Sequence, residues 1–374
     1  MAIKNKIFAG GSIIDARMLV RIVALAGALF LSTGIALAQS PPQDGPAVWQ
    51  YLAELPRDQR LAVMEREAKR EGGITIYGAV GIDRGQILSK VFNERYPDIK
   101  VNYVRLTEAD LVDKVLLEER TNRVNSDLAI STVAWMGLLP KALAPYEPTT
   151  WDEFDPRFRL GSMKEGWTAM VYESLPSTIA WRSDRVKRDD APKTLKQVAD
   201  PKWAGRIGTT THLENLMNGL IQAMGEPAAM ELLKQLSANK PRLYSSTAAL
   251  SQGIAAGEID VAFDFSAHRP FLLKQQGAPI DWVFQDPLFA TGITFSVVKG
   301  AKHPYGAALY MDYLTQARQL EALDKAEGGR FFGNLKGSFS NKLTDYPKLA
   351  AYTPISPERF KQLNRIAEDM FVRR

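Results

Sequence analysis

The chain has no cysteine, and its three histidines lie far apart in the sequence. The absence of cysteine excludes a disulfide framework, which a chain of 374 residues does not need in order to bury a stable core. The catalytic motifs Gly-x-Ser-x-Gly and His-Glu-x-x-His are absent, as is the phosphate-binding Gly-x-x-x-x-Gly-Lys-Ser/Thr. Carboxylates are plentiful, but no spacing singles out a catalytic pair. We therefore expect no catalytic residues, no metal site and no cofactor.

Long apolar runs are also scarce, and the one that stands out lies near the N-terminus. Basic residues lead into an uncharged run at 22–31, and Ala-Leu-Ala follows at 36–38. This order is typical of a secretory signal peptide, so we predict cleavage after Ala38 and export to the periplasm. An uncleaved membrane anchor is the alternative, but such a span needs about 20 apolar residues. A start at Met18 gives a more compact signal, and without cysteine no lipid anchor forms at the cleavage point.

The net charge of +5 comes largely from this N-terminal segment. Residues 1–38 hold four basic residues and one acid, Asp15, so they contribute +3 and leave +2 for the rest. A chain this close to neutral gives little support for nucleic-acid binding, which we do not expect. The remaining length of the chain predicts two lobes or domains.

Strand and helix signals alternate in the first half. A proline-rich leader at 39–48 precedes helical apolar spacing at 57–71, which ends at Gly72-Gly73. Beyond it, β-rich runs lie at 74–77, 99–106 and 127–132, and helical runs lie between them at 86–95 and 107–122. This β-α-β-α-β order predicts a parallel sheet covered by helices.

A second α/β unit follows Trp151. Helical spacing again separates its β-rich runs, and a further β-rich run, two helices and a terminal helix complete the chain. No internal repeat is present. The strand signals lie at 172–181, 207–209, 243–245, 259–264 and 293–298, and the terminal helix lies at 357–371.

Four segments carry a resemblance to a known family. They are 176–184 (Pro-Ser-Thr-Ile-Ala-Trp-Arg-Ser-Asp), 191–207 with its ending Pro-Lys-Trp-Ala-Gly-Arg-Ile, 256–261 (Ala-Gly-Glu-Ile-Asp-Val) and 297–314, which begins Val-Val-Lys-Gly-Ala-Lys-His-Pro. In this order they resemble the crossover and return segments of the iron(III)-type family of extracellular solute-binding proteins. The resemblance implies an α/β, two-lobed periplasmic-binding-protein fold of type II. In that fold each lobe is a mainly parallel sheet flanked by helices, and two crossover strands join the lobes.

The resemblance also implies a division of the chain and a mode of action. After the signal peptide (1–38) and a leader with an N-terminal helix (39–72), lobe 1 is expected at 73–178 plus 267–325. Lobe 2 is expected at 179–266 plus 326–374. Hinge residues at 177–182 and 263–266 then let the lobes close on a small solute in the cleft. The closed protein, a monomer, docks on the permease and ATPase subunits of an ABC importer.

Candidate ligand-binding residues follow the expected strands, because ligands of parallel α/β sheets bind at the carboxyl ends of the strands. Helix N-termini at that edge offer N–H groups and a partial positive charge to anions, although plain helix capping explains many of the same Ser and Thr residues. Arg182 and Arg269 add guanidinium groups that grip a carboxylate or phosphonate, so we expect an anionic organic solute. The predicted set is Val80, Gly81, Arg84, Ser131, Thr132, Trp181, Arg182, Thr211, His212, Ser246, Thr247, Ser266, His268 and Arg269.

A ferric ion is the alternative solute. Ferric-binding members of the family that this chain resembles place two adjacent tyrosines just after the second crossover, where this chain reads Asp-Phe-Ser-Ala-His-Arg at 264–269. Tyr172 and Tyr244 remain as scattered tyrosines near the expected cleft. Four tryptophans suggest an aromatic box for a cationic or ring-bearing ligand, although packing in the core is the commoner role, and Trp181 on the crossover strand is the best candidate among them. They are Trp135, Trp167, Trp181 and Trp203. From another class, a secreted α/β enzyme is the alternative function.

Overall fold

The computed structural model describes residues 40–154, 156–327, 331–332 and 354–373. The predicted signal peptide lies outside these residues, so its cleavage stays a prediction. Within the described residues, no helix is long and apolar enough to cross a membrane.

Two helices precede the first strand. α2 (Gly45–Glu54) buries Trp49 in the first hydrophobic core, and α3 (Arg57–Glu71) buries Met64 there. α3 ends where Gly72 adopts the left-handed conformation, with φ 75°, which glycine reaches without the penalty that a Cβ imposes. The helix predicted at 57–71 is therefore confirmed, whereas α2 occupies part of the segment that we expected to be a leader.

The first lobe is built around a mixed sheet. β1 (Gly73–Gly78) pairs in parallel with β2 (Lys100–Arg105) and β3 (Leu128–Thr132). α4 (Ile82–Arg95) and α5 (Glu108–Arg120) connect these strands, which confirms the predicted β-α-β-α-β order. β10 (Ala290–Val297) runs antiparallel to β3, so the sheet is not wholly parallel.

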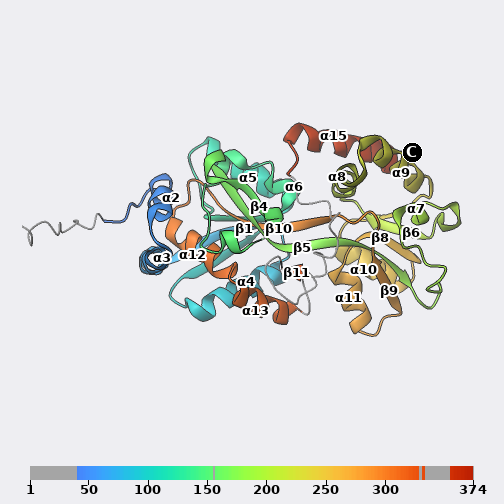
Figure 1. Ribbon diagram of the computed structural model, residues 1–374, viewed down its shortest axis with the longest axis horizontal. Helices are drawn as coiled ribbons and strands as arrows, with labels where there is room; N and C mark the ends of the chain where they lie inside the picture. The colour runs from blue at the N-terminus through green and yellow to red at the C-terminus, as the bar shows by residue number, and fades with distance from the viewer. Residues whose placement is uncertain (1–39, 155, 328–330, 333–353, 374) are drawn as a thin grey trace, which may run out of the picture. The chain divides into compact units, whose positions relative to one another are not determined.

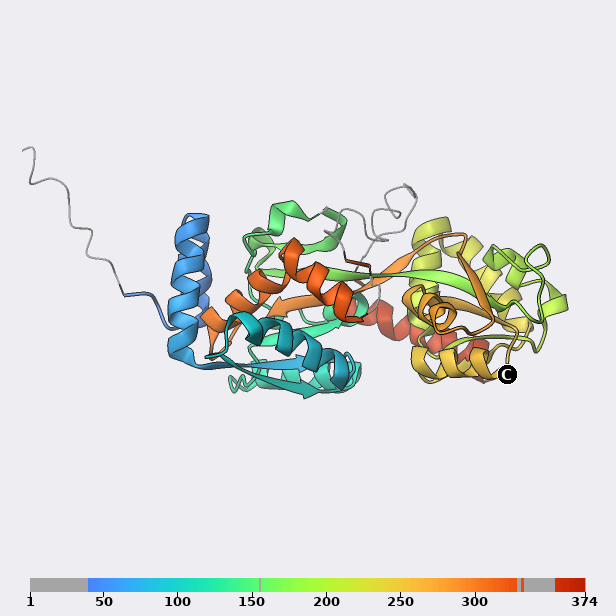
Figure 2. The same ribbon diagram turned by 90° about the horizontal axis from the view of Figure 1, so that it is seen from below.

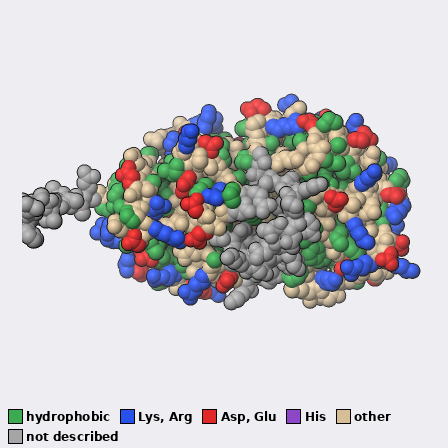
Figure 3. All heavy atoms as spheres, in the orientation of Figure 1, with side chains coloured by type: hydrophobic (Ala, Val, Ile, Leu, Met, Phe, Trp, Pro, Cys, Tyr) green, Lys and Arg blue, Asp and Glu red, His purple; other side chains and the backbone are tan. Residues whose placement is uncertain are grey.

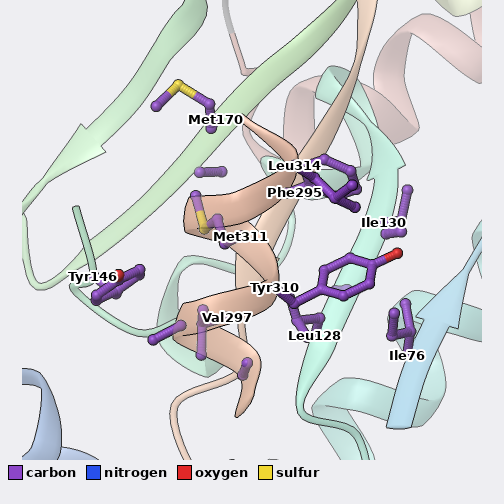
Figure 4. Close-up of a cluster of buried hydrophobic side chains, with 14 of the residues drawn as sticks. Ile76, Leu128, Ile130, Tyr146, Met170, Phe295, Val297, Tyr310, Met311 and Leu314 are labelled. Carbon is purple, nitrogen blue, oxygen red and sulfur yellow. The ribbon is translucent and has the colours of Figure 1, made fainter. Parts of the chain in front are cut away.

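The core of this lobe lies between the sheet and α12 (Pro304–Leu314), which is buried along its whole length. Figure 4 shows Tyr310 of α12 pointing toward Leu128 and Ile130 on β3. The ring of Tyr310 also meets that of Phe295 on β10 edge-on, with centroids 6.0 Å apart. α13 (Ala317–Glu327) follows α12 and packs against α4.

One long strand, β5 (Trp167–Arg182), belongs to both lobes (Figures 1 and 2). Its first half pairs with β4 (Arg159–Ser162), β10 and β11 (Phe331–Phe332). Its second half pairs with β8 (Val261–Ser266) and β9 (Ile280–Phe284). The strand is buried or half-buried along its whole length, because both halves of the molecule pack on it.

The second lobe has β6 (Ile207–Thr210) at its centre, parallel to β7 (Arg242–Tyr244) and β8. The resulting sheet has eleven strands, with the main order β2-β1-β3-β10-β5-β8-β6-β7. The described helices of the second lobe are α7 (Leu195–Val198), α8 (Leu213–Met224), α9 (Glu226–Ala238), α10 (Thr247–Ala256), α11 (His268–Gln275), α15 (Pro357–Ala367) and η6 (Glu368–Val372). Further short turns are α6 (Val133–Met136), η1 (Pro140–Ala142), η2 (Trp151–Glu153), η3 (Pro156–Phe158), η4 (Met163–Glu165) and η5 (Pro201–Trp203).

The second crossing between the lobes lies later in the chain than we predicted. β8 does end beside the hinge, where Ser266 is opposite Ser177 of β5. The chain does not cross there, because α11 turns back and β9 pairs with residues 178–182 of β5. It returns to the first lobe between β9 and β10, at residues 285–289, and not at the predicted 263–266. We propose that the second hinge lies at this crossing. We accordingly propose that lobe 2 includes residues 267–289, which the sequence analysis placed in lobe 1.

Gly306 of α12 lies where this helix packs closely on β1. A Cβ at this position would lie 2.6 Å from Cγ2 of Ile74 and 3.2 Å from Oε2 of Glu71. In a helix Gly→Ala is normally stabilising by about 0.5–1 kcal/mol, whereas forcing atoms into a packed core costs about 1–3 kcal/mol. We expect Gly306→Ala to lower the free energy of unfolding by about 1 kcal/mol or more in urea denaturation.

The matched control is the double variant Ile74→Ala/Gly306→Ala. Removing Cγ2 of Ile74 makes room for the new methyl group, so the two changes should couple by about 1 kcal/mol in a double-mutant cycle. A Gly306→Ala protein as stable as the wild type would contradict the close packing of α12 on β1.

Candidate functional site

A cleft of about 620 Å³ lies between the two lobes. It is lined at the ends of β1, β3, β6, β7 and β8 by the loops that lead into α4, α6, α8, α10 and α11. The carboxyl ends of parallel strands meet at one edge of a sheet, which is why these loops, far apart in sequence, come together. The lining mixes polar and apolar side chains, and part of it comes from the first turns of helices.

The structure brings most of the predicted residues into this cleft. Ser131 lies behind its wall, fully buried, and its hydroxyl donates to Glu108. Thr211 is exposed, its N–H donates to the carbonyl of Tyr244, and its side chain does not line the cleft. The predicted residues that do line it are Val80, Gly81, Arg84, Thr132, His212, Ser246, Thr247, Ser266, His268 and Arg269.

Trp181 and Arg182 are placed elsewhere, which corrects two predictions. Trp181 is 1% exposed and belongs to the second hydrophobic core. Arg182 lies at the end of β5 that is remote from the cleft, and it forms an ion pair with Asp184 at 2.6 Å. Its Nη1 donates to the last carbonyls of α10, on Ile254 and Ala255. A cation at a helix C-terminus stabilises the helix, so this arginine has a structural role.

The structure also gives the positions of Tyr172, Tyr244 and Trp135 relative to the cleft. Tyr172 is fully buried beneath Arg84 and stacks on Phe295, with ring centroids 3.9 Å apart. The hydroxyl of Tyr244 donates to Glu258, and this ring is buried as well. Neither tyrosine lines the cleft, whereas Trp135 does.

Three carboxylates in the cleft were not among the predicted residues. Glu173 of β5 is 1% exposed and pairs with Arg84 at 2.7 Å. A buried charge of this kind is tolerated only when it is paired, so Arg84 is largely neutralised by its partner. No local signal indicates this pair, because Glu173 lies inside a run that predicts only a strand.

Glu108 is the second of these carboxylates. It lies in the first turn of α5 and accepts hydrogen bonds from the Ser131 hydroxyl and, at 3.3 Å, from the Thr132 N–H. Burial raises the pKa of this carboxyl above its ordinary range despite both bonds. From sequence, an acid at this position indicates only a favourable interaction with the helix dipole.

Asp264 is the third, at the end of β8. Its backbone is left-handed, with φ 49°, and its carboxylate accepts the Ser177 hydroxyl at 2.7 Å. Burial, with a smaller contribution from Glu214, raises the pKa of Asp264 to about 6. Beside it, His212 has its pKa raised chiefly by Glu214, whose Oε1 lies 3.7 Å from Nδ1. The acids of the cleft are therefore paired or harder to ionise, while this histidine holds its proton more tightly.

Two α/β lobes joined by a shared strand, with a polar cleft between them, define a solute-binding protein of the clamp type. The family model for bacterial extracellular solute-binding proteins matches residues 81–321, so the chain belongs to this family. Members are periplasmic components of ABC transporters, and the family binds solutes rather than catalysing reactions.

Comparisons with individual proteins agree with this membership. The chain is 25% identical over 321 residues to an uncharacterized protein of Haemophilus influenzae, covering 79% of this chain and 85% of that protein. It is also 25% identical to the major ferric iron-binding protein of Neisseria gonorrhoeae over 201 residues, but these cover only 50% of this chain and 57% of the relative.

Solved structures confirm the type II fold predicted from the sequence. The periplasmic binding protein AfuA of Actinobacillus pleuropneumoniae, with fructose-6-phosphate bound, superposes with a TM-score of 0.67 at 21% identity. Iron-bound HitA of Pseudomonas aeruginosa superposes with a TM-score of 0.63 at 20% identity. The matches cover 80% and 79% of this chain, and 98% and 99% of those chains.

Arg182→Ala now has an expected effect opposite to that of a ligand-binding residue. The variant loses the hydrogen bonds to the end of α10, so we expect a loss of about 1–2 kcal/mol in the free energy of unfolding. Affinity for the solute should stay within about twofold of wild type, as measured by calorimetry. A large loss of affinity without a loss of stability would return Arg182 to the binding site.

Asp264→Asn tests the raised pKa of Asp264. Because its folded pKa of about 6 lies above the ordinary 3.8, ionisation opposes folding, and this contribution lowers stability as pH rises from about 4 to 6. Asparagine accepts the Ser177 hydroxyl and tolerates the left-handed backbone. We expect the variant to be more stable than wild type by about 1–2 kcal/mol at pH 7, with little difference at pH 4.

Thermal melts between pH 4 and pH 8 measure this difference, and Asp189→Asn, an exposed residue, controls for the change in net charge. A constant difference between Asp264→Asn and wild type across the whole range would show that Asp264 ionises normally.

Proposed function

We propose that this protein captures a small organic anion in the cleft between its lobes and delivers it to the membrane permease and ATPase of an ABC importer. The convergence of helix N-termini on one cleft supports the proposal most directly. α4, α8 and α11 begin there without a side-chain cap, and their first-turn N–H groups are suited to an anion. α10 begins there too, capped by Ser246.

The charges around the cleft favour the same class of solute. Arg84 is offset by Glu173, and the pKa of Glu108 and of Asp264 is raised. Arg105 from β2 and Arg269 from α11 also line the cleft, so each lobe contributes a further arginine to it. Elsewhere on the face shown in Figure 3, acidic and basic side chains are interspersed. Arginine side chains from both lobes therefore line the cleft, where they are suited to an anionic solute.

Closure of the lobes is the proposed mechanism of capture. Strand β5 and the segment 285–289 are the described connections, and hinges of this kind need only a few residues to change φ and ψ. A solute that touches Arg105 on one lobe and Arg269 on the other binds the closed form better and shifts the population toward it. We further propose that the protein acts as a periplasmic monomer after removal of residues 1–38.

A ferric ion is the second candidate, because several of the similar proteins are described as binding iron. The described lining of the cleft contains no tyrosine, and among the described residues no three His, Cys, Asp or Glu side chains are grouped to hold a metal. Hard Fe³⁺ prefers anionic oxygen donors, so this lining favours an organic anion over a bare ion. The Trichodesmium relative that carries iron and citrate makes an iron chelate a useful probe.

A thermal-shift screen of residues 39–374 tests the proposal. The panel holds carboxylates, phosphonates, sulfonates, sugar phosphates, polyamines, ferric chloride and ferric citrate. An organic anion at a hundred times its Kd should stabilise the native state by about 2.7 kcal/mol and raise Tm accordingly. Stabilisation by ferric ion alone would favour the second candidate, and stabilisation by cations alone would contradict the proposal.

Arg269→Ala should weaken binding of the anion found in this screen by about tenfold or more, since a charged hydrogen bond contributes about 1.5–3 kcal/mol. Arg269→Lys should recover part of the affinity, because it keeps the charge and loses the paired geometry. Arg120→Ala, at the exposed far end of α5, is the control for net charge. Equal affinity of all three variants would place the anion elsewhere.

A further inference from the structure

The start of helix α15 touches the lobe opposite to the one that carries it. Along its length α15 packs on α8 of lobe 2, and Phe360 and Leu363 are buried in the second hydrophobic core. An ion pair at 2.8 Å between Arg359 and Glu226 ties its first turns to the beginning of α9. α15 is therefore anchored to lobe 2, as Figure 1 shows.

Its N-terminal turn, however, reaches α6 of lobe 1. The rings of Phe360 and Trp135 meet edge-on, with centroids 4.5 Å apart. One turn away, Pro354 lies so close to Gly137 that a Cβ on Gly137 would be 2.6 Å from the Pro354 Cβ. Trp135 packs against both hydrophobic cores, which few side chains in the described part of the molecule do. The lobes are thus in contact here as well as at the hinge.

Trp135 has a second neighbour, because it also lines the cleft. One part of its side chain faces the space that the solute would fill, and another part faces Phe360, which is 6% exposed and does not line the cleft. Separation of α6 from lobe 2 would pull the Trp135 ring off Phe360 and expose apolar surface. The contact therefore favours the form in which the lobes stay close.

We propose that Trp135 and Phe360 form a latch between the lobes, through which the C-terminal helix α15 restrains the opening of the cleft. Trp135 is a positioning residue in this arrangement, because it places α6 against α15 at the wall of the cleft. The inference rests on the proposed function only for its effect on affinity. The restraint on the lobes themselves exists with or without a solute.

The separation of the lobes can be measured directly, because the chain has no cysteine that would compete for labelling. Spin labels at Lys90→Cys on α4 and Gln235→Cys on α9, both exposed, report the distance between lobes in the solute-free protein. We expect Phe360→Ala to shift the distance distribution to longer values.

Phe371→Ala is the matched control, since Phe371 is also a buried aromatic side chain of the C-terminal segment but packs within lobe 2. Circular-dichroism melts verify that each variant is folded, and Phe360→Leu replaces Phe360→Ala if the latter is not. Distances in the Phe360 variant that match those of the wild type and of the Phe371 control would overturn the latch.

Affinity gives an independent readout. If the latch favours the closed form, Phe360→Ala should weaken binding of the anion found in the thermal-shift screen by roughly 2- to 10-fold, the range expected for one aromatic pair. An unchanged affinity together with a longer distance would limit the latch to the empty protein and overturn its link to capture. If no anion binds even the wild type, the proposed function fails, while the distance measurement still decides the latch.

Discussion

The shared strand β5 is the constraint on which the rest of the structure depends. Its first half carries β4, β10 and β11, and its second half carries β8 and β9, so one continuous sheet runs through both lobes. Hydrogen bonds along a buried strand are costly to break, because the freed backbone groups have no water to replace them. Among the described residues, the chain passes between the lobes in β5 near Ser177 and in the return segment at 285–289.

The arrangement of the two lobes on β5 also brings helix N-termini and charged side chains together at the cleft. The loops that follow β1, β3, β6, β7 and β8 all open toward the cleft, so helix N-termini from both lobes face one space. The buried carboxylates of Glu173 and Glu108 are tolerated beside them because both have partners. Glu173 forms an ion pair with Arg84, and Glu108 accepts hydrogen bonds from Ser131 and Thr132. The cleft therefore contains charged side chains of both signs.

The residues that line the cleft could be predicted where their position depends on chain order, but not where it depends on contacts with distant residues. Loops that end parallel strands could be identified from strand and helix signals, so Gly81, His212 and Thr247 were expected at one edge. Arg182 looked equally suitable, but it is the last residue of β5, at the end remote from the cleft, and its guanidinium donates to the end of α10. No local feature of the sequence distinguishes an arginine that binds a ligand from one that donates hydrogen bonds to backbone carbonyls.

Sequence alone determined the α/β class, the two-lobed architecture and the membership of a solute-binding family, because these follow from the order of elements and from local segments that neighbouring residues specify. Tertiary structure decided the rest. It placed the return crossing at 285–289, since α11 and β9 pair back on β5. It also brought Glu173 to Arg84 and Phe360 to Trp135. Those contacts join residues 89 and 225 positions apart, and only the packing of distant elements brings such residues together.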